Sequence, residues 1–383
     1  MASNPFKFGK EVSGRQFYDR VEESENLHRK LSSGTSNVVM YAPRRYGKTS
    51  LVKKVLERFR KEGVATLYFD LNRVATLERF CEEYSSAICS IAGAETEWLH
   101  RASTYLSHLH PTFSFGGDSM VSVSFDFGSK MTSAHLASVL DLAEKVAVES
   151  RKGPLVVAFD EFQEVQRLSP NLPLEGIFRS CIQAHDHVRY LFFGSKTHIL
   201  MRMFGEKSGP FYKSAATLRL SKPPQAESVA FLRERFASCG IGIDDELAAR
   251  IVADTENIPY YLQELSSQVF ETVSSAGRDW VESDDVDGGI HEIVDENSDY
   301  YGEWLRSLSP TQRSLVEALA KEPTAEFPQD YRSRHGLGVS STVHTALKTV
   351  IDNGIVETSA TGYSIGDPFF ARYVLQSATE IGR

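Results

Sequence analysis

Residues that could do chemistry are concentrated in one short stretch that follows an apolar run. The run Val38–Tyr41 leads to Ala42, and a charged amphipathic segment extends from Ser50 to about Lys61. Between them lie Pro43, Arg44, Arg45, Tyr46, Gly47, Lys48 and Thr49. A Gly-Lys-Thr sequence between a strand and a helix is typical of a loop that binds phosphate.

Each part of this stretch has a physical role in holding an anion. Successive backbone N–H groups can curl around a phosphate, and the N-terminus of the following helix adds positive potential. Gly47 lets the backbone come close because it has no Cβ. Lys48 can reach the β- and γ-phosphate oxygens, and the Thr49 hydroxyl can ligate Mg²⁺. Ala42 stands where the pattern usually has its first glycine, so we expect Pro43 to stiffen the loop.

A second pair of candidate residues follows another apolar run. Leu155–Phe159 ends in Asp160 and Glu161, so a buried strand delivers two adjacent carboxylates. Beside a phosphate-binding loop, we expect Asp160 to orient Mg²⁺ and Glu161 to act as the general base that polarises a water. With Lys48 these are the candidate catalytic residues, and Thr49 and Asp160 are the candidate metal ligands. The alternative is that Asp160 and Glu161 are an acidic pair at the end of a surface strand and take no part in catalysis.

A polar residue also follows the apolar run Tyr190–Phe193. Ser195 comes directly after Gly194 there. From a neighbouring strand tip its hydroxyl could sense the γ-phosphate, and a plain turn from strand to loop is the alternative.

Near-continuous apolar runs alternate with helical patterns over the first 220 residues. This alternation predicts an α/β domain with a buried parallel sheet. Further expected strands are Val64–Phe69, Leu155–Phe159, Tyr190–Phe193 and Ala216–Leu220, and the expected helices include Leu77–Ile91, Ala134–Glu149 and Leu174–Ala184. Between Pro111 and Phe127, apolar and polar residues alternate on both sides of Gly116-Gly117-Asp118-Ser119, which predicts an inserted β-hairpin.

The pattern changes after Leu220, where Ser221-Lys222-Pro223-Pro224 interrupts the chain. Helical segments follow at Gln225–Cys239, Asp244–Thr255, Pro259–Ser275 and Ser283–Val294. From Leu308, three helical segments are followed by a hairpin within Ile355–Ile365, which is the pattern of a winged helix. We therefore predict a P-loop ATPase domain at 1–220, a helical lid domain at 221–300 and a winged-helix domain at 301–383.

Composition excludes several classes of protein. The 383 residues carry a formal net charge of −9, so the whole chain is not a general binder of polyanions. No apolar run approaches the ~18 residues of a membrane span, and the N-terminus lacks the apolar core of a secretion signal. The four cysteines form no Cys-x-x-Cys pair, so we expect reduced thiols and a cytoplasmic protein.

Several further motifs join the residues above in one ordered set. It comprises Phe17-Tyr18-Asp19-Arg20, Pro43–Ser50, Asp160-Glu161-Phe162-Gln163, Gly194-Ser195, Gly209-Pro210-Phe211-Tyr212, Pro259-Tyr260-Tyr261-Leu262 and Asp367-Pro368-Phe369-Phe370. The set resembles the archaeal-type ATPase family in the STAND branch of the P-loop NTPases, which is related to AAA+ proteins. The resemblance covers nearly the whole chain.

The resemblance implies roles that the residues alone do not show. Phe17 and Arg20 are implied to lie against the adenine. A Gly-x-Pro motif of the helical domain, here ending in Pro259, is implied to face the nucleotide, and Asn257 in its first position tolerates the left-handed backbone that Gly favours. Lys213 stands where the family often has Arg, and it lacks the planar fork suited to phosphate. Family members are thought to act as ATP-dependent switches.

The leading hypothesis is therefore a Mg-dependent ATPase that couples its ATP or ADP state to binding of a protein partner or to self-association. A scaffold with negligible hydrolysis, an ATP-responsive DNA-binding regulator and a motor are the alternatives. DNA is the alternative partner because winged helices often bind it. However, residues 301–383 carry eight Lys and Arg against nine Asp and Glu, a net charge of −1. This favours a protein partner.

Overall fold

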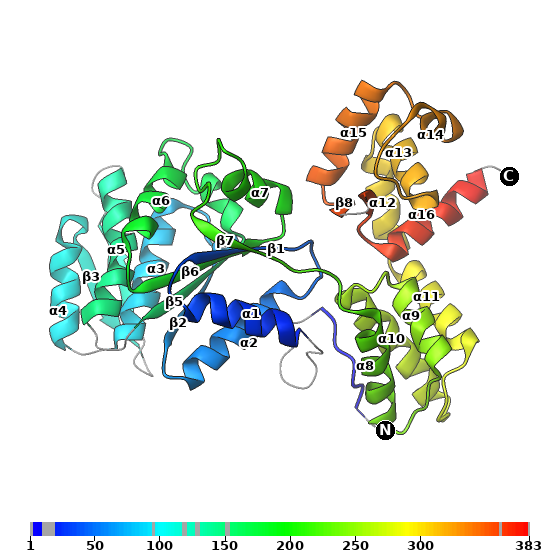
Figure 1. Cartoon of the computed structure of the whole chain (residues 1–383), viewed down its shortest axis with the longest axis horizontal. Coiled ribbons are helices and arrows are strands. Elements are labelled where there is room, and N and C mark those ends of the chain that lie inside the picture. The colour runs from blue at the N-terminus through cyan, green and yellow to red at the C-terminus, as the bar shows by residue number, and fades with distance from the viewer. Residues whose placement is uncertain are drawn as a thin grey trace. The chain divides into compact units, whose positions relative to one another are not determined.

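The computed structural model describes residues 3–9, 20–93, 96–116, 121–126, 131–149, 154–359 and 362–381. The chain divides into two compact units. One unit is Arg20–Ser221, and the other is Lys222–Arg383 together with the N-terminal segment before Arg20. Figure 1 shows the first unit in blue to green, from α1 to β7, and most of the second in green to red.

A five-stranded parallel sheet forms the centre of the first unit. Its strand order is β2-β5-β6-β1-β7. The strands are β1 (Asn37–Tyr41), β2 (Ala65–Asp70), β5 (Leu155–Asp160), β6 (Val188–Gly194) and β7 (Ala215–Arg219). Every residue of β5, which lies between β2 and β6, is buried, as expected for an apolar run covered on both faces. The predicted α/β fold with a parallel sheet is confirmed.

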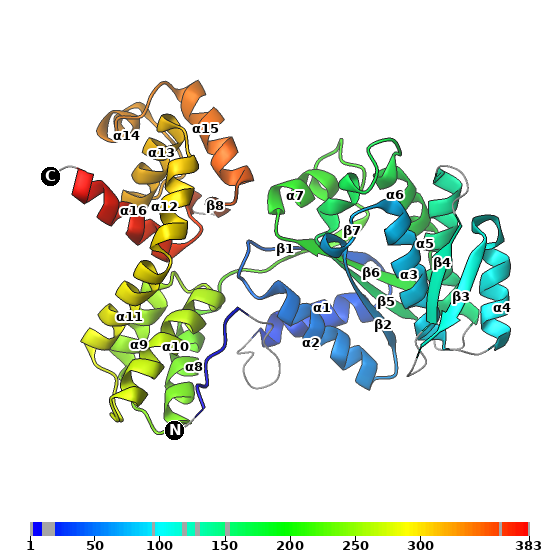
Figure 2. The same ribbon diagram turned by 180° about the vertical axis from the view of Figure 1, so that it is seen from behind.

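Helices cover both faces of this sheet. They are α1 (Val21–Ser32), α2 (Lys48–Lys61), α3 (Leu77–Ala92), α4 (Thr96–Tyr105), α5 (Ser133–Glu149), α6 (Leu174–Ala184) and α7 (Thr197–Gly205). Figures 1 and 2 show α1 and α2 on one face, and α3, α5 and α6 on the other. Helices α1, α4 and α7 were not predicted from the sequence. The described part of the unit also contains the short 3₁₀ turns η2 (Leu71–Arg73), η3 (Ser107–Leu109) and η5 (Phe162–Arg167).

The inserted β-hairpin is present as predicted, with strands β3 (Pro111–Phe115) and β4 (Val121–Phe125) paired antiparallel. Part of its predicted turn lies outside the described residues. Side chains of α3 satisfy the outer edge of β4, because Ser86 Oγ accepts from Val123 N at 2.8 Å and Ser90 Oγ accepts from Val121 N at 3.1 Å. Helix side chains spaced four residues apart thus cover a strand edge that would otherwise be unpaired.

A cluster of buried aromatic rings links the sheet to the strand tips. Phe162 is fully buried and lies 4.5 Å from Phe192 and 5.3 Å from Phe211, measured between ring centroids. Phe159 and Phe178 extend the cluster on the same face of the sheet. Phe162 directly follows Glu161, so core packing fixes the backbone at a candidate catalytic residue.

The second unit begins with a group of four helices. They are α8 (Gln225–Ala237), α9 (Asp245–Asp254), α10 (Pro259–Ser275) and α11 (Ser283–Glu296), close to the predicted bounds. Residues 3–9 pack on this group: Phe6 is buried against Phe231 and Phe236, and Asn4 Nδ2 donates to Ser267 Oγ at 2.9 Å. The predicted domain 1–220 placed residues 3–9 with the sheet instead, and burial of the Phe6 ring explains the difference.

The C-terminal region contains the three helices and the hairpin of the predicted winged helix. They are α13 (Pro310–Lys321), α14 (Gln329–Arg334), α15 (Ser340–Asp352), β8 (Val356–Ser359) and β9 (Gly362–Ile365). Two further helices, α12 (Ser298–Ser307) and α16 (Pro368–Ile381), were not predicted. Ser309 caps α13 in a reciprocal capping box with Gln312. The boundaries at 220 and 300 remain predictions.

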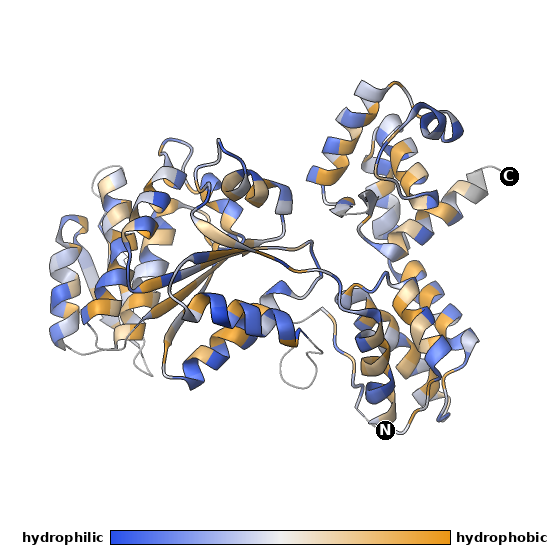
Figure 3. Cartoon of the chain, in the orientation of Figure 1, coloured by the Kyte–Doolittle hydropathy of each residue, from blue (hydrophilic) through white to orange (hydrophobic). Residues whose placement is uncertain are grey.

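Hydrophobic residues concentrate along the central strands and on the sides of helices that face them (Figure 3). Among the described residues, no helix combines the length and the apolar character needed to cross a membrane.

The aromatic cluster generates a stability prediction. Phe162→Ala should lower the free energy of unfolding by about 3–5 kcal/mol, because it empties a fully buried position. Phe115→Ala is the matched control, since this ring is 63% exposed, and its effect should stay within about 0.5 kcal/mol. Urea unfolding of the two variants measures the difference, and equal effects would contradict the assigned role of the cluster.

Candidate nucleotide-binding site

The predicted phosphate-binding loop connects β1 to α2. Gly47 is the N-cap of α2 and has a left-handed φ of 81°. A Cβ at Gly47 would meet no atom within 4 Å, so the backbone conformation rather than lack of space requires glycine there. Arg44 and Arg45 are exposed, whereas Tyr46 and Ser50 are buried. The loop therefore presents its backbone and two cationic side chains at the start of a helix.

The ammonium group of Lys48 lies inside the curve of this loop. Lys48 is only 7% exposed, and its Nζ donates to Ala42 O at 2.9 Å and to Pro43 O at 2.6 Å. Thr197 Oγ1, at the start of α7, donates to the same Ala42 carbonyl at 3.1 Å. Because these contacts use the Ala42 carbonyl and not its side chain, an alanine can replace the usual glycine at this position.

Asp160, the last residue of β5, contacts both α2, the helix that follows the loop, and the neighbouring strand β2. Its Oδ2 accepts from Thr49 Oγ1 at 3.3 Å and from the Tyr68 hydroxyl at 2.5 Å, and its Oδ1 accepts from Glu161 N at 2.8 Å. Burial raises the pKa of Asp160 to about 6, and the hydrogen bond from Tyr68 opposes this rise. Lys53 Nζ lies 4.7 Å above the Tyr68 ring. The carboxyl group is thus positioned by several contacts, although its charged form is disfavoured.

The neighbouring Glu161 occupies a sharp turn at the end of β5. Its φ of 50° is left-handed, which is uncommon for a residue other than glycine. Its carboxylate accepts from Ser195 N at 3.1 Å, from Ser195 Oγ at 2.9 Å and from Gln163 Nε2 at 2.5 Å. A Cβ at Gly194 would come within 2.1 Å of Gln163 Oε1, so glycine leaves the room that this cluster needs.

Two participants in this cluster were not predicted. Tyr68 lies on β2, the strand paired with β5, and Gln163 lies two residues after Glu161. The strand pairing could have indicated Tyr68 only after the strand order was known. Gln163 was visible in the Asp-Glu-Phe-Gln motif, but a role for its amide depends on the left-handed turn at Glu161.

The oxygen atoms present match what Mg²⁺ needs beside a nucleotide. Thr49 Oγ1 and Asp160 Oδ2 lie within hydrogen-bonding distance of each other. Mg²⁺ at such sites is commonly held by one or two protein oxygens together with phosphate oxygens and waters. A metal site with three or more His, Cys, Asp or Glu ligands does not occur among the described residues. The candidate ligands therefore fit Mg²⁺ that binds together with phosphate.

The remaining predicted residues are dispersed. Phe17 lies outside the described residues. Arg20 is only 3% exposed and donates from Nη2 to Tyr46 O at 3.2 Å, so it contacts the loop directly. Pro259 begins α10 in the other unit, after Asn257, whose φ of 56° is left-handed as expected. The structure therefore brings Arg20 to the loop, while the roles of Phe17 and Pro259 remain predictions.

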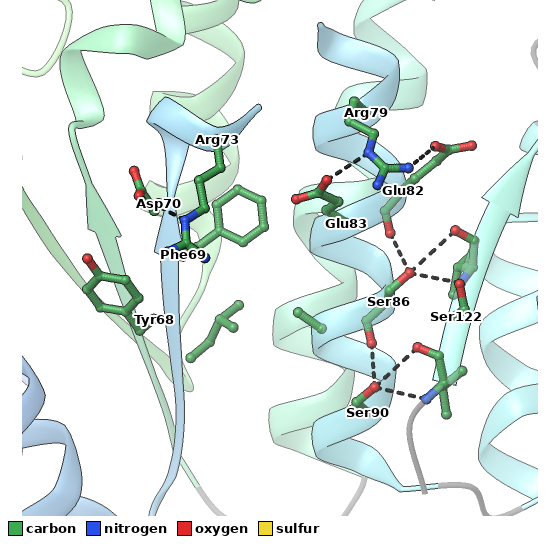
Figure 4. Close-up of a pocket in the computed structure, with 14 residues that line it drawn as sticks. Tyr68, Phe69, Asp70, Arg73, Arg79, Glu82, Glu83, Ser86, Ser90 and Ser122 are labelled. Atoms are coloured by element: carbon green, nitrogen blue, oxygen red, sulfur yellow. Dashed lines mark hydrogen bonds and ion pairs between the residues drawn. The ribbon is translucent and has the colours of Figure 1, made fainter. Parts of the chain in front are cut away.

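A cavity of about 410 Å³ lies elsewhere on the first unit, beside the edge strand β2. Figure 4 shows its two walls, with Asp70 and Arg73 on one side and Arg79, Glu83 and Ser86 of α3 on the other. None of the loop residues lines it. The cavity is lined by none of Lys48, Asp160 and Glu161, but it shares Tyr68 with their cluster.

The fold has counterparts among solved structures. The Walker-type ATPase PABY2304 of Pyrococcus abyssi matches with a TM-score of 0.66 at 17% identity, over 97% of this chain and 99% of that chain. The Aeropyrum pernix ORC2 protein matches with a TM-score of 0.54 at 16% identity, over 95% of this chain and 96% of that chain. At these identities the likeness shows a shared fold. A comparison with curated proteins found no match.

Two family descriptions match the sequence directly. Residues 299–376 match a probable winged helix domain, which agrees with the arrangement of α13, α14, α15 and the β8–β9 hairpin. Residues 17–265 match an ATPase domain predominantly from Archaea, and this range contains the loop, Asp160, Glu161 and Ser195. The chain belongs to this family of ATPase domains found predominantly in Archaea.

Proposed function

We propose that this chain is a Mg-dependent ATPase of slow turnover whose nucleotide state controls its association with a protein partner. The observation that carries the proposal is the convergence of Lys48, Thr49, Asp160 and Glu161 at one end of the parallel sheet. Phosphate contact, metal ligation and general-base chemistry need these groups close together. The Aeropyrum pernix ORC2 protein, which shares the fold, was solved as ADPNP and ADP complexes, and this supports a nucleotide as the ligand.

Phosphate binding is assigned to the loop and to Lys48. The loop residues Pro43, Arg44, Arg45, Tyr46, Gly47, Lys48, Thr49 and Ser50 would surround the phosphates with backbone N–H groups at the start of α2. The contacts of Lys48 Nζ with Ala42 O and Pro43 O hold the ammonium group within the same loop. A phosphate oxygen there would form a charge-assisted hydrogen bond with it.

Thr49 and Asp160 would hold the metal ion. Bound Mg²⁺ supplies positive charge that neutralises the phosphate oxygens as the γ-phosphoryl group is transferred. Ionisation of Asp160 is required for this role, and binding of a cation beside it would lower its pKa from about 6.

Glu161 is proposed to take a proton from the water that attacks the γ-phosphorus. A P–O bond to the water oxygen forms, the bond to the leaving ADP oxygen breaks, and the water proton passes to a Glu161 carboxylate oxygen. In this structure Ser195 and Gln163 donate to that carboxylate. These donors hold the carboxylate in one orientation, and an attacking water would compete with them for it, which favours slow turnover. The same contact would let Ser195 respond to the γ-phosphate.

A protein is the proposed partner class for the winged helix. The outer face of α15 presents Ser341, Thr342, His344, Thr345 and Lys348, which could contact DNA bases. However, the nearby Arg334 and His335 both contact Glu322, at 3.1 Å and 2.9 Å. The hydrogen bond from His335 helps to lower the pKa of the Glu322 carboxyl. This pairing reduces the positive charge available for phosphate contacts, on which DNA affinity largely depends.

Two alternatives remain in the proposal. Negligible turnover by purified protein would favour a nucleotide-binding scaffold, whereas tight, salt-dependent binding of random duplex DNA would favour a DNA-binding regulator. Membership of the STAND branch of P-loop NTPases, which is related to AAA+ proteins, is also part of the proposal. The family match identifies an ATPase domain but does not name a branch.

Nucleotide affinity should depend on the Lys48 charge. Lys48→Ala should weaken ATP binding at least tenfold in calorimetric titration, because a charge-assisted hydrogen bond contributes on the order of 1.5–3 kcal/mol. Lys61→Ala is a suitable control, since Lys61 is 74% exposed at the far end of the same helix. Equal affinities for Lys48→Ala and wild type would show that Lys48 does not bind the nucleotide.

Glu161 should affect turnover more than affinity. Glu161→Gln keeps the size of the side chain but cannot accept the proton, so we expect ATP to bind while phosphate release falls by roughly 10²-fold or more. Ser195→Ala removes the hydroxyl that donates to the Glu161 carboxylate but keeps the base. Its turnover therefore measures the effect of positioning the carboxylate, apart from the effect of losing it. Turnover of Glu161→Gln at the wild-type rate would assign the base elsewhere.

The raised pKa of Asp160 predicts a pH-dependent stability in the absence of nucleotide. Folding favours the protonated form, so the stabilising contribution is complete below the unfolded pKa of 3.8 and is lost as pH rises through about 6. Between pH 4 and pH 8, the free energy of unfolding of Asp160→Asn should therefore rise relative to wild type, by about 2–3 kcal/mol. Chemical denaturation at both pH values measures this difference, and a constant difference would contradict the raised pKa.

A further inference from the structure

The first unit is connected to the second at both of its ends. Residues 10–19 link the segment 3–9, which packs on the helices of the second unit, to Arg20 at the start of the first. The second connection is the peptide bond between Ser221 and Lys222. Arg20 and Ser221 are therefore the two points at which the chain enters and leaves the sheet-containing unit.

The guanidinium group of Arg20 joins these two points. Its Nη1 donates to Ser221 O at 2.5 Å and to Glu23 Oε1 at 2.7 Å. Arg20 is also the N-cap of α1 and has a left-handed φ of 66°. A cation that is 3% exposed would be strongly unfavourable without such partners, so these contacts hold it in one place.

The same guanidinium group contacts the phosphate-binding loop. Nη2 donates to Tyr46 O at 3.2 Å, and Tyr46 immediately precedes Gly47. The chain toward Ser221 is itself tied to the start of the loop, because Leu220 N donates to Tyr41 O at 2.9 Å. One buried side chain thus connects the loop backbone to both ends of the unit.

Peptide geometry makes the contact with Tyr46 O a constraint on phosphate binding. In a planar trans peptide the C=O and the following N–H point in opposite directions, and the described chain contains no cis peptide bond. By accepting from Arg20, Tyr46 O fixes the direction of the Gly47 N–H on the other side of the same peptide plane. A hydrogen bond from this N–H to phosphate would in turn make Tyr46 O a stronger acceptor.

We propose that Arg20 is a positioning residue that couples occupancy of the phosphate-binding loop to the two connections between the units. This inference rests on the proposed function, because it requires nucleotide to bind at the loop. It differs from a contact with adenine, since Arg20 donates to backbone carbonyls of the loop and of the outgoing chain and to the Glu23 carboxylate. Binding of phosphate strengthens the Tyr46–Arg20 hydrogen bond and thereby holds the segments around Arg20 and Ser221 more firmly.

The test compares hydrogen exchange of the full chain with and without Mg²⁺ and a non-hydrolysable ATP analogue. In wild type, the saturating analogue should slow amide exchange at least threefold in α2, around residues 20–24 and around residues 219–222. In Arg20→Met, slowing should persist in α2 but disappear around both connection points. Arg20→Lys should behave like Arg20→Met, because lysine keeps the charge but lacks the planar fork that reaches two carbonyls. Arg20→Lys also carries the test if Arg20→Met does not fold.

Controls separate this role from the alternatives. Arg29→Met removes an exposed arginine of the same helix and should behave like wild type. Loss of slowing around only one connection point, or intact slowing at both in Arg20→Met or Arg20→Lys, would overturn the proposal in favour of a purely structural role. If Arg20→Met loses affinity for the ATP analogue but not for tripolyphosphate, which has no base, Arg20 contacts adenine and the proposal is wrong. No saturable binding by wild type would instead contradict the proposed function itself.

Discussion

The parallel pairing of β5, β6 and β1 is the constraint on which the rest of the structure depends. Tyr41 at the end of β1 is in register with Gly194 at the end of β6, and Phe159 of β5 is in register with Phe192. Parallel strands end at the same edge of a sheet, so the loop after β1, the carboxylates after β5 and Ser195 after β6 meet there. Residues separated by more than a hundred positions become neighbours because of this register.

The site combines residues whose packing stabilises the folded state with residues whose burial or backbone conformation is energetically unfavourable. The buried aromatic cluster fixes the backbone at Phe162, and the Asp160 carboxyl lies in surroundings that disfavour its charge. Glu161 adopts a left-handed turn, and its carboxylate is held by Ser195 and Gln163. Strain and unfavourable burial at one edge of a well-packed sheet are common at functional sites, because the rest of the fold compensates for them.

Much of this arrangement could be predicted from local patterns. Apolar runs located the strands, and the spacing of Gly47, Lys48 and Thr49 located the loop, because these signals depend on neighbouring residues alone. The buried residues of α15, Val343, Ala346, Leu347 and Val350, likewise follow a helical spacing that is visible in the sequence. Such signals are strong because one face of the helix must be apolar to pack.

Contacts that depend on tertiary structure could not be predicted in this way. Tyr68 reaches Asp160 only because β2 pairs with β5, and Arg20 reaches Tyr46 and Ser221 across long sequence separations. The packing of Phe6 on the helical unit was missed for the same reason. The charge of Arg334 and His335 was visible in the sequence, but its pairing with Glu322 was not. Hydrogen bonds between distant residues require the fold before they can be inferred.

The central claim is that the residues at the carboxyl edge of the sheet form one nucleotide site. The most direct measurement is a calorimetric titration of the purified full-length chain with ATP in the presence of Mg²⁺. We predict saturable binding of one ATP per chain, and a clear loss of affinity when Mg²⁺ is removed by a chelator. Absence of saturable binding up to millimolar ATP would contradict the claim.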